Sequence, residues 1–384
     1  MGCCPRVLTQ RAGQNRCPRL GFLTCIWHSL RGKIQTWTEA GGFDAMIASG
    51  NGQTEAGDDP AALARSLEPV IRDSCGGRLG EIQWFKASWQ RGGAATGHAL
   101  WSLGDSDDVP VIVKLPVGST ELDWTVRLGD HGLDRDVVDG QVPHPTPRVL
   151  GSGRKLGGHD LGWLVIERLD GETVAGDLTE QSMLGLLSAA VEFQARADAV
   201  GVPMGPAPAT PDWVSALEKT REWVADNKIT EAPRWKKAVH TTQKLVPAML
   251  GQWESRPINT WCHGDLHPGN AIHISKHSGH PDRCVLIDLA LVHSGHWVED
   301  AVYLEHLFWG HEDKLFGIRP VRHMRKLRKE RGLAVDSSDS KLADIKRLLI
   351  AATAPSFFGV EGDENYMHQS LCLAEELVVR IKGH

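Results

Sequence analysis

The sequence lacks the features of several large protein classes. No apolar run reaches the roughly 18 residues that a membrane-spanning helix needs. Lys and Arg are scattered and the net charge is −6, so no basic surface for nucleic acid is indicated. The 8 cysteines form no CxxC pair and no regular framework, a usage typical of reduced thiols, and we expect a cytoplasmic protein. With 41% hydrophobic and 23% charged residues, the 384-residue chain can form two globular domains.

The first 45 residues contain almost no acid. Five Arg and one Lys occur there, and no acidic residue precedes Glu39. A transit peptide has this character, but serine is scarce and no A-x-A cleavage site follows. Arg6 occupies the position where a myristoylation signal needs Ser or Thr. We expect a disordered N-terminal extension and linker over residues 1–57, either a targeting segment or sequence upstream of a start at Met46. Residues 1–45 should be dispensable for the fold.

A β-rich region follows this extension. Asp, an early Pro and a terminal Gly predict a helix over residues 58–77. Short β-like runs separated by Gly- and Asp-rich turns predict a meander of antiparallel strands. The expected strands lie within residues 81–90, 98–104, 109–116, 144–153 and 162–171, with a helix at 119–132 after the third. These elements form an expected N-lobe over residues 58–168.

The pattern becomes helical after Gly171. Apolar residues at helical spacing predict helices over residues 178–199, 212–227 and 235–253. A linker near Leu169–Glu172 separates the N-lobe from a larger helical C-lobe, residues 169–384. Two lobes joined by one linker predict a cleft between them.

Polar residues occur where this cleft is expected. The segment HGDLHPGN, residues 263–270, lies between two strand-like runs, so Asp265 and Asn270 should project from a turn. Asp288 ends the apolar run Val285-Leu286-Ile287. The oxygens of Asn270 and Asp288 are of the kind that Mg²⁺ prefers, and Asp265 remains available to accept a proton. Lys114 lies inside an apolar strand, where an unpaired charge is costly.

These segments together resemble a known enzyme family. HGDLHPGN, followed by LIDLALVHSGHWVEDAVYLEH, is similar to the catalytic and metal-binding segments of the aminoglycoside phosphotransferase-like (APH/choline kinase) small-molecule kinases. The resemblance covers residues 80–310, with RGGAATG as the phosphate-covering loop, VIVKLP as the lysine strand and LVIERLDGETV as the hinge. It implies an α+β, protein-kinase-like two-lobed fold, with a small β-rich N-lobe and a larger helical C-lobe.

The resemblance also implies roles for individual residues. Asp265 would orient the acceptor hydroxyl and take its proton, and Asn270 and Asp288 would hold Mg²⁺ on the phosphates of ATP. Lys114 would contact the α- and β-phosphates and pair with Glu121, with Asp123 as the alternative partner. The expected cofactor-binding positions of the glycine loop and of the hinge are Gly92, Gly93, Thr96, Gly97, Glu167, Arg168 and Leu169.

The implied activity is transfer of the γ-phosphoryl group of Mg-ATP to a hydroxyl of a small molecule, such as an amino sugar or an amino alcohol. We expect a monomer or homodimer that binds neither nucleic acid nor membrane. A nucleotide-binding pseudokinase is an alternative, although Lys114, Asp265, Asn270 and Asp288 are all present. A protein kinase is less well supported because the H-R-D and A-P-E segments are missing.

Two further features leave alternatives open. His263, His267 and five more histidines up to His296 are compatible with a zinc-dependent hydrolase, but Gly and Pro between the first two oppose the shared helical face that such a site uses. C-terminal acids could face a cationic acceptor or only solvent, and we favour solvent. These acids are Glu361, Asp363, Glu364, Glu375 and Glu376.

Overall fold

The structure is a computed structural model of the chain. It describes residues 60–85, 94–104, 107–129, 144–275, 282–358 and 363–383. The predicted extension at 1–57 lies outside these residues, and so do Gly92 and Gly93 of the glycine loop.

A five-stranded antiparallel sheet forms the N-lobe, with strand order β1-β2-β3-β5-β4. Its strands are β1 (Gln83–Phe85), β2 (Ala95–Trp101), β3 (Val109–Val117), β4 (Val149–Gly153) and β5 (Gly162–Glu167). The first three strands follow one another as the predicted meander, whereas β5 lies between β3 and β4. Helix α2 (Pro60–Ser74) packs on this sheet through Ala64 and Ile71, which are fully buried in the N-lobe core.

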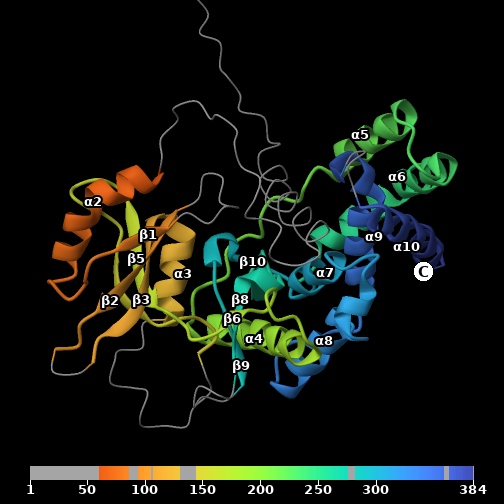
Figure 1. Cartoon of the computed structure of the whole chain (residues 1–384). Helices are drawn as coiled ribbons and strands as arrows, with labels where there is room; N and C mark the ends of the chain where they lie inside the picture. Colours follow the sequence, from red (N-terminus) through yellow and green to blue (C-terminus); the bar gives the residue numbers. More distant parts are fainter. Residues whose placement is uncertain are drawn as a thin grey trace, which may run out of the picture.

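Helix α3 (Ser119–Gly129) belongs to both lobes. Figure 1 shows it on the side of the sheet that faces the C-lobe. Its Trp124 packs against Trp261 of the C-lobe with ring centroids 4.5 Å apart, and Leu128 lies in the same core cluster as the C-lobe helices. The two lobes therefore share apolar packing at α3.

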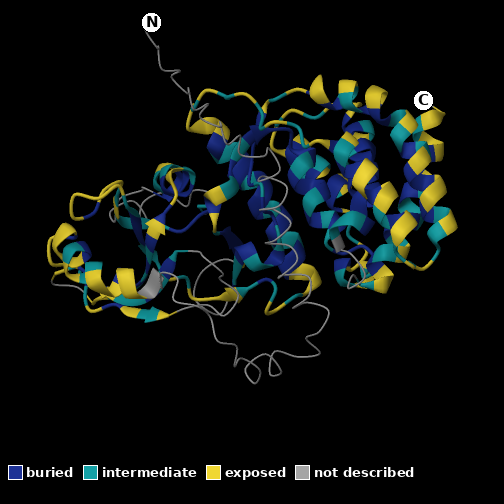
Figure 2. Ribbon diagram, turned by 90° about the horizontal axis from the view of Figure 1, so that it is seen from above, coloured by how far each residue is buried: buried dark blue, intermediate teal, exposed yellow. Residues whose placement is uncertain are grey.

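Helices dominate the C-lobe, as the sequence predicts. They are α4 (Glu180–Ala199), α5 (Trp213–Asp226), α6 (Ala232–Glu254), α7 (Val298–His306), α8 (Pro320–Glu330), α9 (Asp339–Phe358) and α10 (Glu364–Lys382), with the short 3-10 turn η5 (Glu312–Leu315). Thr179 begins α4 with a capping box, in which its side chain accepts a bond from the Ser182 amide and the Ser182 hydroxyl accepts one from the Thr179 amide. The interior of this lobe is coloured as buried in Figure 2. Its core contains the tryptophans Trp213, Trp235, Trp253, Trp261, Trp297 and Trp309.

Short strands lie between the sheet and the helices. Strand β7 (Thr260–Cys262) pairs antiparallel with β10 (His293–Gly295). A second group contains β6 (Glu172–Thr173), β8 (Ala271–Ile274) and β9 (Arg283–Leu286), in the order β6-β8-β9. The HGDLHPGN segment joins β7 to β8, so it lies between the two lobes (Figure 1).

The predicted α+β, protein-kinase-like two-lobed fold is confirmed. Four cysteines of the described residues, Cys75, Cys262, Cys284 and Cys372, are unpaired thiols. Within the same residues, no helix has both the length and the apolar character needed to cross a bilayer.

Candidate active site

Two backbone requirements shape the loop after β7. Gly264 has φ +82°, and a Cβ there would lie 2.2 Å from the carbonyl oxygen of Leu291, so only glycine fits. The Asp300 carboxylate of α7 accepts hydrogen bonds from the amides of His263 (2.9 Å) and Gly264 (3.0 Å). Asp300 is 1% exposed, and these bonds fix the backbone immediately before Asp265.

Both carboxylate oxygens of Asp265 are hydrogen-bonded. Tyr303 of α7 donates to Oδ1 over 2.5 Å, and the Asn270 amide nitrogen donates to Oδ2 over 3.0 Å. The same Asn270 nitrogen also donates to the Asp265 carbonyl oxygen over 2.9 Å. Nε2 of His267 lies 3.5 Å from Oδ2. Asp265 and Asn270, which the sequence places on one turn, thus contact each other, and the carboxylate has a fixed orientation.

His263 joins the Asp265 loop to the segment that carries Asp288. Its Nδ1 accepts a bond from the Asp265 amide over 3.3 Å, so Nε2 carries the proton and donates to the Ile287 carbonyl over 3.1 Å. Burial lowers the pKa of His263, although Asp300 and Asp265 oppose this shift, and the ring stays neutral. His267 instead accepts a bond from the Gly269 amide at the start of η2 (Pro268–Asn270). The two rings do not form the zinc site considered from the sequence.

Asn270 and Asp288 offer oxygen atoms that fit a hard cation. Strand β9 ends at Leu286, one residue before the apolar run does, and Asp288 adopts a left-handed conformation with φ 64° before η4 (Leu289–Leu291). The Asp288 side chain is exposed, and its carboxylate has no hydrogen bond or ion pair within the described part of the chain. The Asn270 nitrogen is engaged with Asp265, which leaves its amide oxygen for a ligand. This donor set suits Mg²⁺.

Lys114 of β3 forms an ion pair with Glu121 of α3. The short connection is sufficient because α3 begins at Ser119, directly after the strand ends at Val117. The alternative acid, Asp123, pairs with Arg154 at the surface instead. Burial alone would lower the pKa of Lys114, but the charges of Glu121 and Asp288 outweigh it and raise this pKa. The N-lobe lysine and the C-lobe carboxylate therefore lie close enough to influence each other.

Several predicted residues of the glycine loop and the hinge already take part in strand pairing, packing or backbone hydrogen bonds. Thr96 pairs with Lys114 across β2 and β3. At Gly97 a Cβ would lie 2.4 Å from Cγ2 of Ile82, so this glycine is required by strand packing. In the hinge, the amide of Glu167 donates to Arg148 and that of Arg168 to Pro110, each over 2.9 Å.

The amide of Leu169 makes no backbone hydrogen bond with the described residues. Of the three expected hinge residues, Leu169 is therefore the one whose amide is available to donate a hydrogen bond to a nucleotide base.

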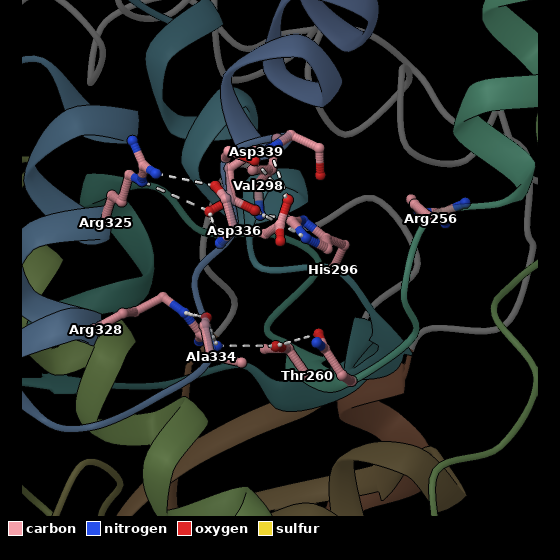
Figure 3. Close-up of polar contacts among 12 residues, drawn as sticks. Arg256, Thr260, His296, Val298, Arg325, Arg328, Ala334, Asp336 and Asp339 are labelled. Carbon is pink, nitrogen blue, oxygen red and sulfur yellow. Dashed lines mark hydrogen bonds and ion pairs between the residues drawn. The ribbon is translucent and has the colours of Figure 1, made fainter.

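A network of buried side-chain hydrogen bonds leads to Asp300, which holds the Asp265 loop. Arg328 of α8 donates to Oε1 of Gln194 (2.6 Å) and to the Thr260 hydroxyl of β7 (3.3 Å), as Figure 3 shows for Thr260. Gln194 then donates through Nε2 to Asp300 over 3.2 Å. Burial lowers the pKa of Arg328 to about 10, so the guanidinium remains charged at neutral pH. This chain of contacts connects α8 and α4 to the acid that holds the Asp265 loop.

Tyr303 and Asp300 were not assigned roles from the sequence. Both lie in VEDAVYLEH, which was matched to the family as a segment only. Their relation to the loop depends on the orientation of α7, and a helical segment with one Tyr and several acids carries no distinctive signal of it.

Comparison with known proteins agrees with this geometry. The profile of the phosphotransferase enzyme family (APH) matches residues 103–322. An aminoglycoside phosphotransferase structure from Alicyclobacillus acidocaldarius superposes with a TM-score of 0.53 at 13% identity, covering 86% of this chain and 97% of that chain. This similarity shows the fold alone. No curated protein sequence matches the chain significantly.

Two further solved structures are less similar. A spectinomycin phosphotransferase in complex with ADP and spectinomycin has a TM-score of 0.47 and 13% identity, covering 82% of this chain and 96% of that chain. A choline/ethanolamine kinase family protein from Mesorhizobium loti has a TM-score of 0.44 and 12% identity, covering 83% and 95%. The family profile spans more than half of the sequence and contains Lys114, Asp265, Asn270 and Asp288. The chain belongs to the phosphotransferase enzyme family.

Proposed function

We propose that the protein transfers the γ-phosphoryl group of Mg-ATP to a hydroxyl of a small molecule. The observation that carries this proposal is the proximity of four groups from two lobes. Asp265 and Asn270 are in direct contact, and the charge of Asp288 in the C-lobe raises the pKa of Lys114 in the N-lobe. Phosphoryl transfer needs this combination of a proton acceptor, oxygen ligands for a metal and a cation for the phosphates.

In this mechanism Asp265 orients the acceptor hydroxyl through a carboxylate held by Tyr303 and Asn270. The hydroxyl proton passes to Asp265 as the oxygen attacks phosphorus. Lys114, held by Glu121, binds the phosphates that do not transfer. Mg²⁺, when held by Asn270 and Asp288, supplies positive charge that stabilises the phosphates in the transition state. Leu169 offers an amide for the base.

We propose an amino sugar, an amino alcohol or a related metabolite as the acceptor. The C-terminal acids do not favour a cationic acceptor, because several are engaged in ion pairs. Asp363 pairs with His311, Glu375 with Arg234 and Glu376 with Arg380. A charged acceptor would have to compete with these partners.

The direct test is ATP consumption by the purified protein with a panel of amino sugars, amino alcohols, sugars and nucleosides. We expect acceptor-dependent ADP formation and a phosphorylated product of matching mass. Asp265→Asn should lower turnover by about 10²–10⁴-fold. Its affinity for Mg-ATP should remain close to that of the wild type, because Asp265 contacts the acceptor.

Two outcomes separate the alternatives. Mg-ATP binding without transfer to any acceptor in the panel would favour the nucleotide-binding pseudokinase. A folded Asp265→Asn variant with near-normal turnover would reject the catalytic assignment of Asp265, and its melting temperature, measured beside the wild type, distinguishes a failed fold from failed chemistry.

A further inference from the structure

A thiol, an imidazole and a carboxylate converge behind the Asp265 loop, and the mechanism uses none of them. They are Cys262, His293 and Glu299, whose candidate ligand atoms all lie within 4.8 Å of one another. Cys262 is fully buried, while His293 and Glu299 are partly accessible. We propose that these three residues form a Zn²⁺ site that joins β7, β10 and α7, with the fourth position open to water.

The fold places the three side chains on one side of the β7–β10 pair. Cys262 and His293 are directly opposite each other in the antiparallel register, so their side chains project to the same face. Glu299 reaches the same point from the first turn of α7. One ligand from each of three elements would connect them at a single point.

His293 has the ring orientation of a metal ligand. Its Nδ1 lies 2.9 Å from the Leu291 carbonyl oxygen and donates to it, so Nε2 is the nitrogen directed at the other two side chains. Nε2 lies 3.7 Å from Oε2 of Glu299. Ligand atoms of a tetrahedral zinc site are about 3.3–3.7 Å apart, so this edge needs little adjustment.

Glu299 is held in place through one of its two oxygens. Its Oε1 accepts hydrogen bonds from Nε of Arg256 (3.0 Å) and from the His296 amide (2.9 Å), whereas Oε2 faces His293. Carboxylates that bind a metal through one oxygen are commonly oriented by hydrogen bonds to the other oxygen.

Gly295 leaves the space that the site needs. A Cβ at this position would lie 2.8 Å from Oε1 of Glu299 and 3.0 Å from Sγ of Cys262. Any side chain would therefore force the carboxylate and the thiol apart.

The neighbouring charges are compatible with a dication. Arg256 and Lys346 are cationic, and Asp300 and Arg328 also act on Cys262. Burial raises the pKa of the Cys262 thiol well above its usual value, so the thiol keeps its proton until a metal displaces it. Glu299 raises the pKa of His293 against the effect of burial. Because Zn²⁺ would replace protons on sulfur and imidazole, its binding adds little net charge beside Arg256 and Lys346. Mixed sulfur, nitrogen and oxygen donors favour Zn²⁺ over Mg²⁺.

Co²⁺ provides the first test, using the full chain stripped of metal with a chelator. One equivalent of Co²⁺ should give a thiolate-to-cobalt charge-transfer band in the near ultraviolet. The band should vanish in Cys262→Ser and remain in Cys284→Ser, the matched control with another buried cysteine. No band, or a band that survives Cys262→Ser, would overturn the proposal, and the second result would assign the metal to other cysteines.

Zn²⁺ affinity, measured by competition with a chromophoric chelator, provides the second test. His293→Gln and Glu299→Gln should each lower it by at least about 100-fold, since loss of an outer-shell partner alone costs about 10–100-fold. His240→Gln, an exposed control, should change nothing. Gly295→Ala keeps all three ligands but removes the space between them, so it should also weaken binding. Wild-type affinity in Gly295→Ala or His293→Gln would contradict the geometry, even if Cys262→Ser failed to fold. These readouts do not depend on phosphotransferase activity.

Discussion

Tyr303 donates a hydrogen bond to Oδ1 of Asp265 over 2.5 Å. Burial raises the pKa of Tyr303 well above its usual value, and the neighbouring Asp265 charge raises it further, so the phenol remains a donor at any working pH. The residue proposed to accept the proton is therefore oriented by a helix that follows it by more than thirty positions.

Removing this donor should slow turnover and shift its pH dependence. A hydrogen bond to a charged group contributes about 1.5–3 kcal/mol, so Tyr303→Phe should lower kcat by about 10–100-fold. A carboxylate that loses a donor has a higher pKa, so the acid limb of the rate profile should move to higher pH. Nucleotide affinity should be unchanged. Tyr366→Phe, which alters the chain's other tyrosine, is the control; an unmoved acid limb in Tyr303→Phe would show that this bond is only structural.

The Lys114–Glu121 pair should control the use of ATP. Glu121→Gln removes the charge that holds the Lys114 ammonium, and we expect KM for ATP to rise by about 10-fold. Asp123→Asn, on the same helix, should change KM by less than about 2-fold because Asp123 pairs with Arg154 at the surface. Steady-state kinetics with varied ATP decides between the two acids. Equal effects in both variants would contradict the pairing.

Asn270 and Asp288 should respond differently to added Mg²⁺. Asp288→Asn removes only a ligand charge, so excess Mg²⁺ should restore much of the turnover. Asn270→Ala also removes the donor to Asp265, so turnover should stay low at any Mg²⁺ concentration. Titration of activity with Mg²⁺ at fixed ATP gives the comparison. Asp282→Asn is the control, because Asp282 pairs with His273 at 2.5 Å; an identical response of the two site variants would reject the separate roles.

His306 should make stability depend on pH. Burial, which is its largest influence, lowers the pKa of this 2% exposed residue to about 4, compared with about 6.5 in an unfolded chain. Between these values the unfolded chain binds the proton and the folded chain does not. The free energy of unfolding should therefore decrease as pH falls from 6.5 to 4, by up to about 3 kcal/mol from this residue.

Urea unfolding at pH 7.5 and pH 5 checks this. His306→Gln should lose less stability between the two pH values than the wild type does. The exposed control His240→Gln should behave like the wild type. If His306→Gln and the wild type lose the same amount, another group titrates in this range.

The sequence predicts the elements better than their contacts. Short strands and helices could be placed because turn residues and apolar runs act locally. The choice of Glu121 over Asp123 agrees with the ion pair. The roles of Tyr303 and Asp300 require the direction in which α7 faces, which no local pattern encodes. The strand before Asp288 was expected to be longer because apolar residues continue past Leu286, but a left-handed residue ends it.

Some residues predicted to bind the nucleotide also make hydrogen bonds or packing contacts within the protein, and the sequence does not reveal these contacts. The hinge is expected to offer the backbone of Glu167, Arg168 and Leu169 to the base, and the amides of the first two also donate to Arg148 and Pro110. Gly97 is expected near the phosphates, and its contact with Ile82 is a second reason for glycine at this position. The approach of Cys262, His293 and Glu299 could not be anticipated, because it combines a strand register with the position of a helix.

Helix α3 constrains how the enzyme can move. Trp124 and Leu128 anchor it in the core of the C-lobe, while Glu121 on the same helix holds Lys114 of the sheet. The sheet can therefore move relative to the C-lobe only by carrying α3 with it or by breaking the Lys114–Glu121 pair. An isolated N-lobe would leave Trp124 and Leu128 facing water, so calorimetry of the whole chain should give one cooperative transition instead of two.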